Sequence, residues 1–263
     1  GQAYEYLLEQ FADSAGKKAG EFFTPREVVR LLVELVEPKE GMKICDPTCG
    51  SGGMLIWSTK YVQEHKGDPN NLTLHGQERL YGNYGICNMN MILHGMENFR
   101  IEHENVLTNP LLVEDGKLLY YDRVLANFPF SMNWDNSAGA KDKYKRFKFG
   151  VPSAKGKADF AFIQHIFSIL NSEGKAAIIC SQGVLFREKK EQKIREKMIT
   201  DLDADIIEAV IALPSNLFYG TGIPACILIL NRIKPINHRN KILFIYAAKD
   251  FEPLPKRDRL RKS

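Results

Sequence analysis

The sequence predicts an α/β domain built on a mostly parallel sheet with helices on both faces. Short apolar runs alternate along the chain with segments that repeat apolar residues at helical spacing. Parallel neighbours need a long crossover connection, usually a helix, so this alternation is typical of βαβ units. A glycine-rich turn at residues 50–53 follows the first apolar run. Strand, glycine turn and helix in that order are typical of α/β folds that bind nucleotides.

The individual elements follow from local patterns. Residues 1–19 are predicted to be a helical lead-in that continues a helical region upstream, and residues 20–263 to be one domain. Runs of apolar and β-branched residues predict strands at 42–46, 72–77, 99–103, 121–126, 175–181, 205–212 and 225–231, with a candidate edge strand at 241–247. Apolar residues at helical spacing predict helices at 25–37, 53–65, 81–94, 158–171 and 187–201. Residues 131–157 fit neither pattern and are predicted to be a loop.

Composition narrows the class of protein. The 263 residues, 29.9 kDa, 44% hydrophobic and 26% charged content suit one soluble globular domain. No apolar run approaches the roughly 20 residues of a membrane span, and no secretory signal opens the chain. Five cysteines without paired spacing predict a reducing, cytoplasmic setting and buried thiols, and they argue against a zinc site or any other metal site. The net charge is only +4, so any surface for a polyanion must be local.

The glycine turn at residues 46–53 has the sequence Asp-Pro-Thr-Cys-Gly-Ser-Gly-Gly. It lacks the Gly-x-Gly-x-x-Gly spacing of dinucleotide enzymes, because Leu55 occupies the last position, and it lacks the Gly-Lys-Ser/Thr of a P-loop. The Asp46 carboxylate would repel a phosphate and favour an ammonium or sulfonium group. Glu78 ends the next apolar run, where an acid can bind a ribose diol. The pattern favours a nucleoside site over an ordinary βα turn.

A tetrapeptide of unusual chemistry, Asn127-Phe128-Pro129-Phe130, ends the apolar run at 121–126. The Asn127 side-chain oxygen and the Phe128 carbonyl can both accept hydrogen bonds from an NH2 group. The Phe130 ring can stack on the flat base that carries this amine. A strand that ends in an ordinary turn is the alternative interpretation.

The segment that begins the first predicted helix holds a Thr24-Pro25 pair, which predicts an N-cap with proline at the first helical position. The free N–H groups of such a helix start suit a carboxylate. From spacing alone, a plain capped helix explains this segment equally well.

The predicted loop at 131–157 is basic and aromatic, and it directly follows the tetrapeptide. Basic residues among aromatic ones suit nucleic acid, through phosphate contacts and stacking. A solvated surface loop is the alternative. The candidate DNA contacts are Trp134, Lys141, Lys143, Lys145, Arg146 and Lys148.

Together these segments resemble adenine-specific DNA methyltransferases, and in particular the modification (methyltransferase) subunit of type I restriction-modification systems. The resemblance rests on residues 21–26, 46–53 and 127–130 with Glu78, and more weakly on 158–165 and 212–224. It covers nearly the whole chain. One position departs from the family pattern, because Phe128 stands where the family usually has proline.

The resemblance implies a class I S-adenosylmethionine-dependent methyltransferase fold, with seven strands of which the last is antiparallel. It implies S-adenosylmethionine as cofactor, methyl transfer to the adenine amine, DNA as substrate and a specificity subunit as partner, and it leaves open whether a nuclease (restriction) subunit takes part. Residues 127–130 would be catalytic. The residues assigned to the cofactor are Glu21, Phe22, Phe23, Thr24, Pro25, Arg26, Asp46, Thr48, Gly50, Ser51, Gly52, Gly53, Glu78 and Asn105.

Other functions remain open at this point. The same clamp could hold a planar amine in RNA or on a protein glutamine, and a non-catalytic DNA-binding scaffold is a further alternative. A nicotinamide-dependent oxidoreductase is opposed by the glycine spacing and by the clamp. Methylation of a cytosine carbon is disfavoured, because that chemistry uses a Pro-Cys nucleophile and none of the 12 prolines is followed by cysteine.

Overall fold

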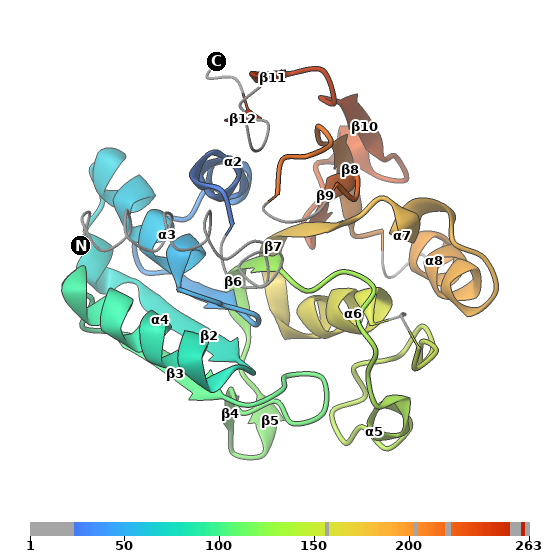
Figure 1. Ribbon diagram of the computed structural model, residues 1–263, viewed down its shortest axis with the longest axis horizontal. Coiled ribbons are helices and arrows are strands. Elements are labelled where there is room, and N and C mark those ends of the chain that lie inside the picture. The colour runs from blue at the N-terminus through green and yellow to red at the C-terminus, as the bar shows by residue number, and fades with distance from the viewer. Residues whose placement is uncertain (1–23, 156–157, 202–204, 219–221, 253–258, 261–263) are drawn as a thin grey trace.

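The computed structural model describes residues 24–155, 158–201, 205–218, 222–252 and 259–260, and it has the predicted α/β architecture (Figure 1). An eight-stranded sheet runs in the order β10-β8-β9-β7-β6-β1-β2-β3. Its strands are β1 (Lys43–Asp46), β2 (Thr73–Glu78), β3 (Phe99–His103), β6 (Tyr121–Asn127), β7 (Leu170–Ser181), β8 (Ile207–Ala212), β9 (Ala225–Asn231) and β10 (Leu243–Tyr246). The seven predicted strands are confirmed, and the candidate edge strand is the eighth, β10.

Strand direction explains where a ligand can bind. Within this sheet β9 runs antiparallel to both β7 and β8, and the other pairings are parallel. The chain passes from β1 to β2 and β3 on one side, and then to β6 and β7 on the other. The strand order therefore reverses beside β1. In open α/β sheets, ligands bind at the carboxyl ends of the strands at such a reversal.

Helices cover both faces of the sheet, as the sequence predicts (Figure 1). One core packs α2 (Arg26–Val36), α3 (Gly53–Glu64) and α4 (Tyr81–Leu93) against the strands, and the other packs α6 (Asp159–Ile169) and α8 (Lys190–Thr200). Strand residues alternate between the two cores because successive side chains point to opposite faces. Leu125 of β6 joins the first core, whereas its neighbours Val124 and Ala126 join the second.

Short elements complete the described part of the chain. They are α5 (Asn136–Ala140), α7 (Gly183–Phe186), two 3-10 turns at Pro69–Asn71 and Ile236–His238, and two antiparallel strand pairs, β4 (Val113–Glu114) with β5 (Lys117–Leu118) and β11 (Phe251–Glu252) with β12 (Arg259–Leu260). The predicted buried thiols are confirmed, because all five cysteines are buried and free. Among the described residues, no helix combines the length and apolar character needed to cross a membrane.

Two helix starts differ from the prediction. Pro25 is the N-cap residue of α2 rather than its first helical residue, and no side chain caps this helix. The Thr24 hydroxyl instead accepts a hydrogen bond from Asn127. The helix predicted at 187–201 begins only at Lys190, because Lys189 has φ 63, outside the α-helical region. The predicted lead-in at 1–19 lies outside the described residues.

Candidate active site

Three of the predicted polar residues lie at the same edge of the sheet. Asp46 ends β1, Glu78 ends β2 and Asn127 ends β6, and these strands are adjacent and parallel. A pocket opens at this edge. It is lined by residues of the glycine turn, of the end of β2 and of the tetrapeptide. Its lining consists of Pro47, Thr48, Gln77, Glu78, Arg79, Leu80, Glu104, Asn105, Val106, Asn127, Pro129, Met132 and Phe162.

The glycine turn after β1 requires glycine for conformation and for space. Gly50 and Gly52 have φ values of 52° and 82°, in the left-handed region that favours glycine. Gly52 is also the N-cap residue of α3, and a Cβ there would lie 2.9 Å from the Cys87 sulfur of α4. The turn is tied to β2, because the Cys49 N–H donates to the Gln77 carbonyl at 3.1 Å. The main chain at the start of α3 is therefore fixed against the neighbouring strand.

Two carboxylates lie beside this turn. Asp46 is only 3% exposed, and burial, with a smaller contribution from the charge of Glu78, raises its pKa to about 7, although a hydrogen bond from the Thr48 N–H opposes the shift. The Glu78 carboxylate accepts from the Gly50 N–H at 3.0 Å and from the Leu80 N–H at 2.7 Å. A buried acid beside a second acid favours a cationic ligand, because the cation offsets both the burial and the repulsion.

The amide of Asn127 is oriented by a residue far away in sequence. Its Nδ2 atom donates to the Thr24 hydroxyl at 2.9 Å. This bond uses the donor end of the amide, so Oδ1 remains available as an acceptor in a residue that lines the pocket. Thr24 lies directly before α2, and the start of that helix is thus joined to the end of β6.

The two phenylalanines of the tetrapeptide have different environments. Phe128 is 1% exposed and stacks face to face on Phe162 of α6, with ring centroids 4.7 Å apart and an interplanar angle of 10°. This stack restrains the main chain where the family usually has a proline. Phe130 is partly exposed, and its ring packs edge to face against Phe218, with ring centroids 6.2 Å apart. One face of Phe130 is thus not covered by this partner.

Comparisons with known proteins agree with this geometry. The family model described as N-6 DNA Methylase matches residues 1–263. The chain belongs to the N-6 DNA methylase family. The type I restriction enzyme HindI methylase subunit of Haemophilus influenzae is 36% identical over 250 residues, which are 94% of this chain and 54% of that protein.

Solved structures show the same similarity. The type I restriction-modification system methyltransferase subunit of Streptococcus thermophilus has a TM-score of 0.86 and 34% identity, covering 99% of this chain and 54% of that one. A Listeria monocytogenes protein described as a class I S-adenosylmethionine-dependent methyltransferase has a TM-score of 0.68 and 21% identity over 92% of this chain and 76% of that one, which shows the fold alone. The predicted class I methyltransferase fold is therefore confirmed. The chain spans about half the length of the type I subunits that it matches.

In this N-6 DNA methylase domain the structure brings most of the predicted cofactor residues to the sheet edge. Thr48, Glu78 and Asn105 line the pocket. The Asn105 Oδ1 atom accepts from the Leu107 N–H at 3.0 Å, which orders the turn that follows β3. Arg26 is the first residue of α2, and the predicted contacts Glu21, Phe22 and Phe23 lie outside the described residues.

The predicted DNA-contact segment is folded, and its residues fall into two groups. Lys141, Lys143, Lys145 and Lys148 are exposed. Arg146 is 2% exposed; its guanidinium pairs with Asp142 at 2.9 Å and donates to the carbonyls of Val106 and Leu107. Trp134 is 7% exposed, and its indole N–H donates to the Ser153 carbonyl at 3.1 Å.

The prediction that Trp134 and Arg146 contact DNA therefore conflicts with the structure. Both side chains are buried and hydrogen-bonded within the protein, where no phosphate can reach them. Arg146 anchors the segment to the turn after β3, since buried charges need such partners. A signal for this exists in the sequence, because Asp142 and Arg146 are four residues apart and oppositely charged.

Two residues of the site, Gln77 and Phe162, are not predicted as site residues by the sequence patterns. Gln77 is 1% exposed, lines the pocket and donates through Nε2 to the carbonyls of Glu104 and Asn109. Phe162 forms the pocket wall behind Phe128. Phe162 lies in the segment 158–165 that resembles the family, but its role depends on contacts with β6 that only the fold creates.

Proposed function

We propose that this chain is the catalytic part of a type I modification methyltransferase, which transfers a methyl group from S-adenosylmethionine to the exocyclic amine of adenine in DNA. The observation that carries the proposal is the single pocket shared by Thr48 and Glu78 with Asn127 and Pro129. A methyl donor bound by the first pair and a planar amine bound by the second would meet there. Membership of the N-6 DNA methylase family supports this assignment.

The acids at the carboxyl ends of β1 and β2 suit S-adenosylmethionine. The buried Asp46 carboxylate, whose pKa burial raises to about 7, suits the ammonium of a methionine. Each Glu78 oxygen accepts one N–H and keeps a lone pair for a ribose hydroxyl. Residues 50–53 would allow close approach of the cofactor, and Asn105 would lie beside its adenine. By resemblance to the family, residues 21–26, of which the structure describes 24–26, would surround the methionine end.

The tetrapeptide would hold the target amine. The bound cofactor supplies a methyl group activated by a sulfonium, so alignment and electrostatics are the protein's task. The Asn127 Oδ1 atom and the Phe128 carbonyl would accept the two amine hydrogens and direct the nitrogen lone pair at the methyl group. No strong base is needed, because the amine proton becomes acidic once the nitrogen is methylated. The adenine must leave the duplex to reach this clamp, and Phe130 would stack on it.

Sequence choice is proposed to come from another chain. The exposed Lys141, Lys143, Lys145 and Lys148 could bind phosphates, but phosphate contacts carry no sequence information directly. The described elements after Asn127 mostly complete the sheet. Similarity to type I methylase subunits supports a specificity subunit as partner, bound by two methyltransferase copies.

Calorimetry and base-resolution mapping test these proposals together. The chain alone should bind S-adenosylmethionine but show weak, salt-sensitive DNA binding, and it should methylate adenine at a defined site only when the specificity subunit is present. Asn127→Ala should leave cofactor affinity nearly unchanged and remove most methyl transfer. Equal loss of both would mean that Asn127 is structural. Efficient modification of one defined sequence by the chain alone would refute the partner proposal.

The same assay separates the remaining functions. Labelled cofactor is incubated in parallel with duplex DNA, with RNA and with protein. Label in RNA or on glutamine, but not in DNA, would reassign the substrate. Cofactor binding without transfer to any of the three, with the partner present, would favour a non-catalytic scaffold.

A further inference from the structure

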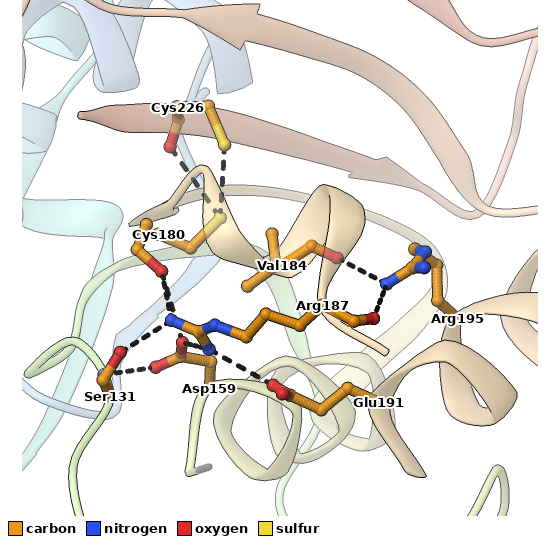
Figure 2. A network of polar contacts seen from close by, with 9 residues as sticks. Ser131, Asp159, Cys180, Val184, Arg187, Glu191, Arg195 and Cys226 are labelled. Atoms are coloured by element: carbon orange, nitrogen blue, oxygen red, sulfur yellow. Dashed lines mark hydrogen bonds and ion pairs between the residues drawn. The ribbon is translucent and has the colours of Figure 1, made fainter. Parts of the chain in front are cut away.

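A cluster of polar side chains lies directly behind the tetrapeptide, at the carboxyl end of β7. Asp159 is the first residue of α6 and is fully buried, and Arg187 follows the short helix α7. Figure 2 shows the Arg187 guanidinium between the carboxylates of Asp159 and Glu191, with its tip directed at Ser131. Ser131 is the residue that follows the tetrapeptide. The mechanism proposed above uses none of these groups.

Ser131 is held at two atoms by the same ion pair. The Asp159 Oδ1 atom accepts from the Ser131 N–H at 2.8 Å. The Arg187 Nη2 atom donates to the Ser131 hydroxyl at 2.6 Å and to the Ser181 hydroxyl at 2.9 Å, and its Nη1 atom pairs with Asp159 Oδ2. Hydrogen bonds that involve a charged partner are shorter and stronger than neutral ones. The main chain and the side chain of Ser131 are thereby both fixed.

The backbone at Ser131 needs this restraint. Its φ is 53°, in the left-handed region that residues with a side chain rarely adopt. Strain of this kind persists only where the surroundings impose it. Gly183 contributes by leaving space, because a Cβ there would lie 2.5 Å from the Arg187 Nε atom. The guanidinium thus occupies a place that the fold keeps free.

The guanidinium remains charged in this place. Burial lowers the pKa of Arg187, but the hydrogen bond and charge of Asp159, with the charge of Glu191, outweigh burial and raise it. Without Arg187, the Asp159 carboxylate would be a buried charge that has lost its counter-ion, and such losses disturb the local structure strongly.

Helix α6 therefore contacts the chain both within the tetrapeptide and directly after it. Phe162 stacks on Phe128, and Asp159 binds Ser131 one residue after Phe130. We propose that Arg187 and Asp159 are positioning residues for methyl transfer, which fix Ser131 and so align the Phe128 carbonyl and the Phe130 ring with the target base. This inference rests on the proposed function, because it assigns its effect to the adenine clamp.

The test uses the full-length methyltransferase assembled with its specificity subunit. Arg187→Ala is compared with Arg232→Ala, a matched control that also removes a partly buried arginine contacting α6. Arg232 donates to the Phe167 carbonyl near the other end of that helix and stacks over the Phe167 ring, away from Ser131. Single-turnover methylation, cofactor affinity and Tm are measured for each variant.

We expect Arg187→Ala to lower the methylation rate about 10- to 100-fold, the range that small misplacements of reacting groups produce, with cofactor affinity unchanged. Arg232→Ala should lower Tm but leave the rate near that of the parent. With 2-aminopurine at the target position, Arg187→Ala should also reduce the fluorescence rise that reports capture of the flipped base. Arg187→Lys should restore only part of the rate, because an ammonium lacks the fork that spans Ser131 and Asp159.

A second variant keeps the test decisive if Arg187→Ala folds poorly. Ser131→Ala removes only the exposed hydroxyl that Arg187 binds and leaves the N–H bond to Asp159 intact. It should lower the rate without lowering Tm, and the double variant Ser131→Ala/Arg187→Ala should lose less than the sum of the two single losses, since both remove the same contact.

Three outcomes would count against the inference. They are a rate for Arg187→Ala equal to that of Arg232→Ala, an unchanged rate for Ser131→Ala, and additive losses in the double variant. Asn127→Ala, run beside them, tests the proposed function separately. If Asn127→Ala methylates normally, the clamp itself is wrong. If it is inactive while Arg187→Ala and Ser131→Ala are unaffected, only the positioning role fails.

Discussion

Thr24→Val tests whether the orientation of the Asn127 amide limits catalysis. Valine replaces the hydroxyl by a methyl group of similar size, so packing before α2 is kept and only the acceptor for Asn127 Nδ2 is lost. The amide can then rotate, and its oxygen is no longer held in one orientation. The perturbation thus acts on the proposed clamp without touching a group that is proposed to contact the target base.

The expected magnitude follows from the single hydrogen bond removed. A net hydrogen bond contributes about 0.5–1.5 kcal/mol, which corresponds to about a 2- to 13-fold fall in the methylation rate. Residues 21–26 are also proposed to surround the methionine end of the cofactor, so cofactor affinity is measured for each variant and the rates are compared at saturating cofactor, where they report the clamp alone. Thr24→Ser keeps the hydroxyl and should retain most of the rate.

Single-turnover methylation of duplex DNA, measured with the specificity subunit present, supplies the assay. Thr200→Val is the matched control, because it removes an exposed hydroxyl that donates to the Glu196 carbonyl of α8. That variant should methylate normally. A Thr24→Val rate equal to that of Thr200→Val, with Asn127→Ala inactive, would show that the amide is oriented by the substrate and not by Thr24.

Three further predictions concern the base, the cofactor and the basic segment. Phe130→Ala should weaken capture of the flipped adenine by about 1–3 kcal/mol, the usual contribution of one stacked base, and unchanged activity on duplex DNA would argue against stacking. Because burial raises the pKa of Asp46 to about 7, cofactor affinity should fall as pH drops through that value and the carboxyl loses its charge. The apo protein should lose stability as pH rises from about 4 to about 7 and level off above it, because over that range the carboxyl is ionised in the unfolded chain but kept protonated by burial in the folded one. Asp46→Asn should flatten both curves by calorimetry and thermal unfolding. Arg146→Met should destabilise the fold by about 3–5 kcal/mol, because it leaves Asp142 as an unpaired buried charge. Lys141→Ala should instead leave Tm unchanged and reduce the salt slope of DNA binding by about one; the reverse pattern would restore Arg146 as a DNA contact.

The Phe128 position shows how a departure from a family pattern can be accommodated. Proline would restrain the main chain through its ring, whereas Phe128 is restrained by a stack on Phe162 with centroids 4.7 Å apart. Both arrangements leave the carbonyl of residue 128 available as an acceptor. Packing of Phe128 on Phe162 therefore restrains the main chain in place of the proline ring.

The sequence by itself determined the strands, most of the helices and the nucleotide turn. These features depend on neighbours two to four residues apart, so the alternation of apolar and polar residues and the glycines at 50 and 52 encode them directly. The candidate site also followed from sequence in outline, because the carboxyl ends of parallel strands meet at one edge. That rule alone brings Asp46, Glu78 and Asn127 together.

The tertiary structure alone decided which side chains face solvent and which hold the site in place. Thr24 and Asn127 are 103 residues apart, and Ser131 and Arg187 are 56 apart. No local period relates such pairs. Composition also could not separate the buried Arg146 from the exposed Lys145 beside it. The physical reason is that burial of a polar group depends on whether partners reach it, and those partners are brought together only when distant elements pack.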